Sequence, residues 1–277
     1  MLSSFKGYFC CLVYFLLFTS ICDARVVAIE GNTGAGKTTL INLLANEMKA
    51  IVVSEPFEKW RDVNGAGDLF AEYIRDPKTW SLHLAIYSAA TKIEALKSAL
   101  RSELLLIDRS IFADRHAFAE KMLRSGELSQ THFSAYQDML ACMLKEKPFL
   151  EAFIIPYDRQ LPLHREIYTK AFSYIETPFS YKIDGIIYLR TSPEICSKRA
   201  AKRNRDAKDP DAGPNGSFYQ QLGQAHDEWL YDKATVKVAG NDVRVLTVNG
   251  DVDFERDDDA KTKTLISVKE FINSLPK

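Results

Sequence analysis

The sequence predicts an α/β fold in which a parallel sheet carries helices on both faces. From residue 25 onward, short apolar runs alternate with longer segments that have helical spacing. A glycine-rich turn joins the first apolar run to the first helical segment. Such alternation builds βαβ units, and ligands of these sheets bind beyond the carboxyl ends of the strands.

Five apolar runs indicate the strands of this sheet. They are residues 25–29, 51–53, 104–107, 185–189 and 243–248. Pro56 closes the second strand, and the third ends at Asp108. Glu30, Glu55 and Asp108 therefore fall at strand ends, where chemistry is expected.

Helical segments separate these strands. They are residues 38–49, 80–100, 111–123, 133–144 and 264–275. Another helix opens at Thr191, because the T-x-x-E capping box places Pro193 in a first helical turn. Residues 146–183 mix prolines, aromatic residues and charges without clean periodicity, and a surface insertion is expected there.

Composition indicates one large globular domain, residues 25–277. The chain has 277 residues, of which 46% are hydrophobic, and its formal net charge is −1. A chain with almost no net charge is not attracted electrostatically to nucleic acid as a whole, so no nucleic-acid partner is expected. The five cysteines contain no C-x-x-C pair, so neither a zinc site nor a disulfide framework is indicated.

Residues 1–24 form a hydrophobic leader, and its composition favours export from the cell. Lys6 precedes a nearly apolar stretch, residues 8–22, and Ala24 could mark a cleavage point, as in a secretory signal peptide. A misplaced start codon, an organelle presequence and a membrane anchor stay open as alternatives. Any membrane contact is expected only through this leader, whereas the rest of the chain, with its isolated cysteines, looks like a reduced intracellular protein of the cytoplasm or mitochondrion.

The glycine-rich turn fits the phosphate-loop pattern G-x-x-x-x-G-K-[ST] and lies between a strand and a helix, as that motif requires. Its expected phosphate-binding residues are Gly31, Asn32, Thr33, Gly34, Ala35, Gly36, Lys37, Thr38 and Thr39. Backbone N–H groups and the helix N-terminus would face phosphate oxygens, Lys37 would reach the β- and γ-phosphates, and Thr38 would ligate Mg²⁺. The alternative is an accidental match, which this context disfavours. The fold is therefore predicted to be of the P-loop NTPase type, with five parallel strands.

Four further motifs follow the loop in order, and a basic run comes after them. They are residues 54–56 (SEP), 58–61 (EKWR), 108–110 (DRS) and 188–193 (YLRTSP). Together they resemble the deoxynucleoside kinase family over most of residues 25–250. The N-K-x-D motif of GTPases is absent from the sequence. Thymidylate kinases share the loop, E-P and D-R motifs, so a nucleoside monophosphate kinase stays open as an alternative.

The resemblance implies specific catalytic roles. Glu55 would be the general base for a 5′-hydroxyl, and Arg109 would hold Glu55 or the transferring phosphoryl group. Asp108 would bind Mg²⁺ directly or through water, although relatives often carry Glu there. The alternatives are a surface carboxylate at position 55 and a purely structural strand-end ion pair at Asp108 and Arg109.

The resemblance implies that the basic run is a lid over the ATP phosphates. Arg199, Arg203 and Arg205 would neutralise charge on the departing phosphoryl group. Lys198 and Lys202 share one side of the same helix. A solvated basic helix face is the alternative.

The acceptor pocket follows from the same resemblance. Trp60 and Tyr73 would pack on the nucleoside and bind its 3′-hydroxyl, although Trp60 could instead serve the core. An acidic residue after the lid would also bind this hydroxyl, and Asp206, Asp209 and Asp211 compete for that role.

The base-reading residues depart from the family pattern. Ala85 stands where relatives carry a glutamine that reads the base edge, so a neighbour such as His83 substitutes, specificity is altered or activity is lost. Lys92 and Asp114 match an Arg–Asp pair of cytidine- and purine-selective relatives. The prediction is an ATP- and Mg²⁺-dependent deoxynucleoside 5′-kinase for nucleotide salvage that favours purine or cytosine bases. The family also implies a homodimer. A catalytically altered nucleotide-binding protein is the non-enzyme alternative.

Overall fold

The computed structural model describes residues 24–99, 103–144, 161–176, 182–203, 217–254 and 256–276, but not the side chains of Phe172, Tyr174, Ile175, Glu176 and Arg203. The predicted leader lies outside the described residues, except for Ala24, which is buried in the core. Arg205, Asp206, Asp209 and Asp211 also lie outside them.

A single sheet organises the molecule. Its strands are β1 (Arg25–Glu30), β2 (Ile51–Val53), β3 (Leu104–Asp108), β4 (Gly185–Arg190), β5 (Thr235–Val238) and β6 (Asn241–Asn249). Their order across the sheet is β2-β3-β1-β4-β6-β5, and every pair is parallel except β5 with β6. The five predicted strands and their parallel arrangement are therefore confirmed.

The sixth strand, β5, was not predicted. It pairs with β6 through a two-residue turn, in which Ala239 and Gly240 have φ values of +48° and +80°. Positive φ at both positions suits the twist of a hairpin, and Val236 and Val238 alternate with exposed residues as edge strands do.

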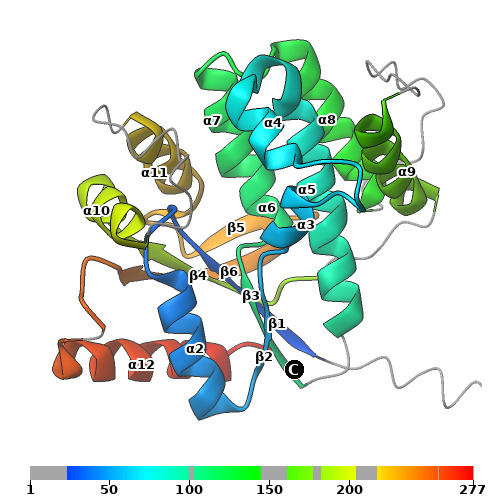
Figure 1. Ribbon diagram of the computed structural model, residues 1–277. Coiled ribbons are helices and arrows are strands. Elements are labelled where there is room, and N and C mark those ends of the chain that lie inside the picture. The colour runs from blue at the N-terminus through cyan, green and yellow to red at the C-terminus, as the bar shows by residue number, and fades with distance from the viewer. Residues whose placement is uncertain are drawn as a thin grey trace, which may run out of the picture.

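Strand periodicity divides the core into two layers. Val26 and Ala28 of β1 face one hydrophobic cluster, whereas Val27 and Ile29 face the other. The first cluster is covered by α5 (Pro77–Ala99), α8 (Gln130–Met143) and α9 (Pro162–Glu176). The second is covered by α2 (Lys37–Met48) and α12 (Asp258–Asn273), on the opposite face of the sheet in Figure 1.

The remaining helices frame the carboxyl ends of the strands. They are α3 (Phe57–Arg61), α4 (Leu69–Arg75), α6 (Ile111–Ala113), α7 (Ala119–Arg124), α10 (Pro193–Arg203) and α11 (Ser217–Leu230). The helix predicted over 111–123 contains a π-helical turn, η1 (Asp114–Phe118), between α6 and α7. Such turns occur often at functional sites, and this one begins at the candidate base-reading residue Asp114.

The segment expected to be a surface insertion behaves differently over its second half. Residues 162–176 form α9, which packs against α5 and buries Leu163, Ile167, Tyr168 and Ala171 in the core. The surface expectation is therefore wrong for this helix, because its apolar side chains recur at helical spacing and complete the helical layer. Residues 145–160 and 177–181 lie outside the described residues.

Candidate active site

The phosphate loop is folded tightly between the end of β4 and α10. Gly31 has φ +147°, and a β-carbon there would lie 2.6 Å from the Leu189 carbonyl oxygen. Gly34 has φ +80°, and its missing β-carbon would meet the Cys196 carbonyl oxygen. Both positions therefore require glycine, and Gly36 directly precedes α2. The loop backbone thus reaches the start of a helix, as anion binding requires.

Asn32 and Lys37 lie inside this loop. The Asn32 side-chain amide donates to the Tyr219 carbonyl oxygen at 2.7 Å and links the loop to α11. Lys37 Nζ donates to the carbonyl oxygens of Gly31 (3.1 Å) and Asn32 (2.9 Å). Burial, followed by the charge of Arg109, lowers the pKa of Lys37 to about 8. The Lys37 ammonium is therefore buried at the place where the loop motif expects phosphate.

The two candidate metal ligands lie together. Thr38 Oγ1 donates to Asp108 Oδ2 at 2.9 Å, which joins the start of α2 to the end of β3. A hydroxyl and a carboxylate are oxygen donors of the kind that Mg²⁺ prefers, and Mg²⁺ usually takes its other ligands from water and phosphate. Within the described ranges, no group of three or more His, Cys, Asp and Glu residues could hold a metal ion. The pair suits an ion that the substrate helps to bind.

Glu55 is held by two cations. Arg109 Nη1 donates to both carboxylate oxygens, at 3.0 Å to Oε1 and 2.8 Å to Oε2. Lys92 Nζ lies 3.2 Å from Oε1. Burial alone would raise the pKa of Glu55, but Arg109, Lys92 and Lys37 outweigh it and lower that pKa to about 2. The Glu55 side chain is 22% exposed, so it is an ionised acceptor that keeps access to the site.

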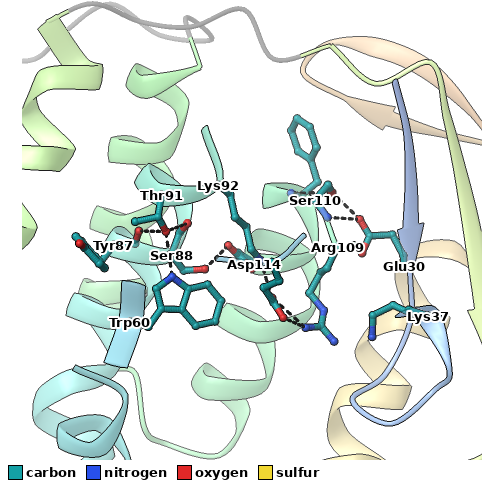
Figure 2. Close-up of polar contacts among 12 residues, drawn as sticks. Glu30, Lys37, Trp60, Tyr87, Ser88, Thr91, Lys92, Arg109, Ser110 and Asp114 are labelled. Atoms are coloured by element: carbon teal, nitrogen blue, oxygen red, sulfur yellow. Dashed lines mark hydrogen bonds and ion pairs between the residues drawn. The ribbon is translucent and has the colours of Figure 1, made fainter. Parts of the chain in front are cut away.

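Lys92 also contacts the candidate base-reading aspartate (Figure 2). Lys92 Nζ lies 2.5 Å from Asp114 Oδ1, and Ser88 Oγ donates to Asp114 Oδ2 at 2.8 Å. Burial alone would lower the pKa of Lys92, but Asp114 and Glu55 outweigh it and raise that pKa above its usual value. The predicted pair is thus formed, and its ammonium also reaches Glu55, which the sequence did not indicate.

Trp60 lies at the border between the core and this site. Its indole Nε1 donates to Thr91 Oγ1 at 3.0 Å, and Lys92 Nζ lies 5.6 Å from its ring centroid. The side chain is also part of the core cluster on the α5 face. Packing in the core and lining the site are therefore compatible at this position.

The structure separates His83 from Ala85. Residues two positions apart in a helix sequence point in directions about 200° apart around the helix axis. Ala85 lies on the side of α5 from which Ser88 and Lys92 contact Asp114. The His83 ring instead stacks on His164 of α9, with ring centroids 4.3 Å apart. His83 therefore does not replace the missing glutamine, because it faces the opposite side of the helix.

Tyr73 makes a contact that the sequence did not predict. Its hydroxyl donates to Glu127 Oε2 at 2.8 Å, and Lys121 Nζ lies 2.5 Å from Glu127 Oε1. Ser81, one turn before Ala85 on α5, donates to the Glu127 carbonyl oxygen. Glu127 lies in the turn between α7 and α8, where no periodic pattern singles it out.

Among the candidate lid residues, Arg199 is engaged with backbone carbonyls. Its Nη1 donates to the Ala35 (3.1 Å) and Gly250 (2.7 Å) oxygens, and its Nη2 donates to Val252 (2.9 Å). Arg203 ends α10. Arg199 thus joins α10 to the phosphate loop and to the segment after β6.

Among the described helices, none is both long and apolar enough to cross a membrane.

Comparison with known proteins is consistent with this geometry. The model of the deoxynucleoside kinase family matches residues 27–156 and 159–273. A probable deoxycytidine kinase of fowlpox virus (strain NVSL) is 29% identical over 253 residues, which cover 91% of this chain and 89% of the relative. Deoxycytidine kinase 1 of Xenopus laevis is 28% identical, covering 92% of both chains. Mitochondrial thymidine kinase 2 of Homo sapiens is 27% identical, covering 83% of this chain and 72% of the relative.

Proposed function

Because the chain belongs to the deoxynucleoside kinase family, whose members are phosphotransferases acting on nucleosides, we propose that it transfers the γ-phosphoryl group of ATP to the 5′-hydroxyl of a deoxyribonucleoside. The reaction would serve nucleotide salvage. A cytosine or purine base is favoured in this proposal.

One observation carries the proposal. An ionised carboxylate, Glu55, lies at the strand-end edge of the sheet on which the phosphate loop also opens, and Arg109 and Lys92 orient it. A hydroxyl acceptor needs such a group near its oxygen. Thr38 and Asp108 supply oxygen donors beside the same loop.

The chain's own residues divide the work as follows. Glu55 accepts the proton of the 5′-hydroxyl as that oxygen bonds to the γ-phosphorus, and the bond from the γ-phosphorus to the bridging oxygen of ADP breaks. Arg109 keeps the Glu55 carboxylate in position, and Lys37 with the loop N–H groups neutralises phosphate charge. Catalysis then rests mainly on positioning and electrostatics. When bound, Mg²⁺, held by Thr38 and Asp108, would neutralise charge on the phosphate oxygens.

The base preference is argued from the buried Lys92–Asp114 pair. Carboxylate and ammonium groups can together bind a polar base edge that carries both an amino group and an acceptor atom. Cytosine and the purines offer such edges, and the deoxycytidine kinases among the relatives support cytosine. Trp60 and Tyr73 would enclose the base and sugar in the same proposal.

The roles of the lid arginines, a homodimeric state and an intracellular location belong to the proposal as well. They rest on likeness to the family. Light scattering on the purified chain tests the dimer, and microscopy of the tagged full chain tests the location and the role of the leader.

The deciding experiment measures ADP release by the full chain with ATP and Mg²⁺. Each of the four deoxynucleosides and each of the four monophosphates is offered separately. We expect turnover on deoxycytidine or a purine deoxynucleoside. Turnover confined to monophosphates would favour a nucleoside monophosphate kinase, and ATP binding without turnover would favour a nucleotide-binding protein.

A further inference from the structure

Glu30 is a buried carboxyl group that the catalytic scheme leaves without a role. It is the last residue of β1, has no exposed surface and lies beside Tyr188 in the sheet register. Its Oε1 accepts two hydrogen bonds from Ser110, at 2.9 Å from the backbone nitrogen and 2.6 Å from Oγ. Its Oε2 has no hydrogen-bond partner within the described part of the chain. Figure 2 shows the Glu30 carboxyl directed at Ser110, beside Arg109.

The turn that Glu30 contacts has an unusual backbone. Arg109 has φ +66°, in the left-handed region that a β-carbon disfavours. A non-glycine residue keeps this conformation only where its surroundings determine it. The backbone conformation at position 109 sets the direction of the Arg109 side chain. The contacts that fix this turn therefore also position the guanidinium group beside Glu55.

Three consecutive residues at the end of β1 hold this turn. The Ile29 carbonyl oxygen accepts from the Arg109 backbone nitrogen at 3.1 Å. The Glu30 carboxylate binds Ser110 as described. The Gly31 carbonyl oxygen accepts from Arg109 Nη2 at 3.3 Å. Both ends of the turn and the guanidinium itself are therefore bound to one short stretch of chain, through two backbone carbonyls and one carboxyl group.

We propose that Glu30 is a positioning residue for Arg109, acting through Ser110 to hold the left-handed turn that directs the guanidinium at Glu55. The proposal rests on the proposed function, in which Arg109 orients the general base. Burying a carboxyl group at a strand end has a free-energy penalty. Burial accordingly raises the pKa of Glu30 above its usual value. Local departures of this kind are expected where function requires a particular geometry.

The test compares full-chain variants in kcat, in the KM for ATP and in melting temperature. Glu30→Ala removes the acceptor, whereas Glu30→Gln keeps an oxygen that can accept from Ser110. A misplacement of about 1 Å can cost about 10²-fold in rate, so we expect kcat to fall by 10- to 100-fold in Glu30→Ala with little change in the KM for ATP. Glu30→Gln should recover most of that rate.

Ser110→Ala covers the case in which Glu30→Ala fails to fold, and it should lower kcat in the same way. Ser125→Ala is the control, because the Ser125 hydroxyl also donates a hydrogen bond but to the Met122 carbonyl oxygen, and it should keep wild-type kcat. In an Arg109→Ala background, Glu30→Ala should lower kcat no further. A lower melting temperature with unchanged kcat, or additive losses in the double variant, would overturn the proposal.

A crystal structure of Glu30→Ala, or of Ser110→Ala if the former does not fold, separates this inference from the proposed function. We expect Arg109 to leave Glu55 or the turn to change conformation. An unmoved Arg109 overturns the positioning role even if the enzyme phosphorylates nucleosides. A wild-type chain that is inactive on every acceptor would instead refute the proposed function, and the structure would still decide the positioning role.

Discussion

Arg109 binds the Glu55 carboxylate through a single guanidinium nitrogen, because Nη1 donates hydrogen bonds to both Oε1 (3.0 Å) and Oε2 (2.8 Å). The two residues follow β3 and β2, which are neighbours in the sheet. Parallel strands end at one edge, so this neighbourhood brings the two side chains together. The second guanidinium nitrogen is bound to Gly31 of the phosphate loop. The proposed general base and the phosphate loop are therefore connected through one side chain.

Glu55→Gln should lower kcat by about 10²–10⁴-fold while ATP binding stays near normal, because the amide cannot take the 5′-hydroxyl proton. Steady-state ADP release and titration with a non-hydrolysable ATP analogue measure the two quantities. Glu58→Gln, at an exposed position in α3, is the control and should keep wild-type kcat. An unchanged rate in Glu55→Gln would remove Glu55 from the mechanism.

Glu55 should also make stability depend on pH. Its pKa is about 2 in the folded chain, compared with 4.5 as the ordinary value. A lowered folded-state pKa stabilises the fold above the unfolded-state pKa, and that contribution is lost as the pH falls through the folded-state pKa. Urea unfolding of wild type and Glu55→Gln should therefore differ by a constant free energy from pH 7 to pH 5, with wild type more stable. The difference should shrink at pH 4 and pH 3, and a gap that widens with acid would contradict the assignment.

Much of the candidate site at the carboxyl ends of the strands can be predicted from sequence, because the motifs that indicate it are formed by neighbouring residues. The phosphate loop requires glycine at set positions, and Glu30, Glu55 and Asp108 each follow an apolar strand. The contact of Lys92 with Glu55 could not be predicted in this way, since it depends on how α5 lies across the end of β2. Glu127 was missed for a similar reason, because a turn residue has no periodicity that reports its long-range partner Tyr73. Helix α9 was missed because its charged and aromatic residues obscure a buried stripe that includes Leu163, Ile167, Tyr168 and Ala171.

Replacing the Lys92–Asp114 pair by Lys92→Met with Asp114→Ala should shift acceptor preference toward thymidine. The ratio of kcat/KM for deoxycytidine to that for thymidine should fall by about 5- to 150-fold, since losing polar contacts to a base edge costs about 1–3 kcal/mol. Parallel assays with both nucleosides measure this ratio. An unaltered substrate order would contradict the pocket assignment.

The single variant Lys92→Met tests how much the buried pair contributes to stability. Both side chains are buried, so removing one partner leaves an uncompensated carboxylate and should cost about 3–5 kcal/mol of unfolding free energy. The double variant should recover much of that loss. Asp114→Ala completes the cycle, and losses of the two single variants that add up in the double variant would mean that the pair is not coupled.

Arg199→Ala should destabilise the chain even without ATP. Its guanidinium binds carbonyls of the phosphate loop and of the segment after β6, and charged hydrogen bonds typically contribute about 1.5–3 kcal/mol. Urea unfolding without nucleotide measures this loss, and Arg199→Lys should recover only part of it because an ammonium lacks the planar fork. If stability without ATP is unchanged and only the KM for ATP rises, then the role of Arg199 is confined to phosphate binding.

Ala85→Gln tests whether the missing amide limits acceptor binding. Ala85 lies on the side of α5 that carries Ser88 and Lys92 toward Asp114, so a glutamine there would extend into the proposed base pocket. A new pair of hydrogen bonds to the base edge should lower the KM for the preferred deoxynucleoside about tenfold, with kcat little changed, because the contact forms equally in the ground and transition states. Ala89→Gln, one turn further along α5 in the same hydrophobic core cluster as Ala85, is the comparison and should lower the melting temperature without improving KM. If Ala85→Gln loses stability and gains no affinity, then the proposed base pocket does not extend to position 85, which packs in that core cluster.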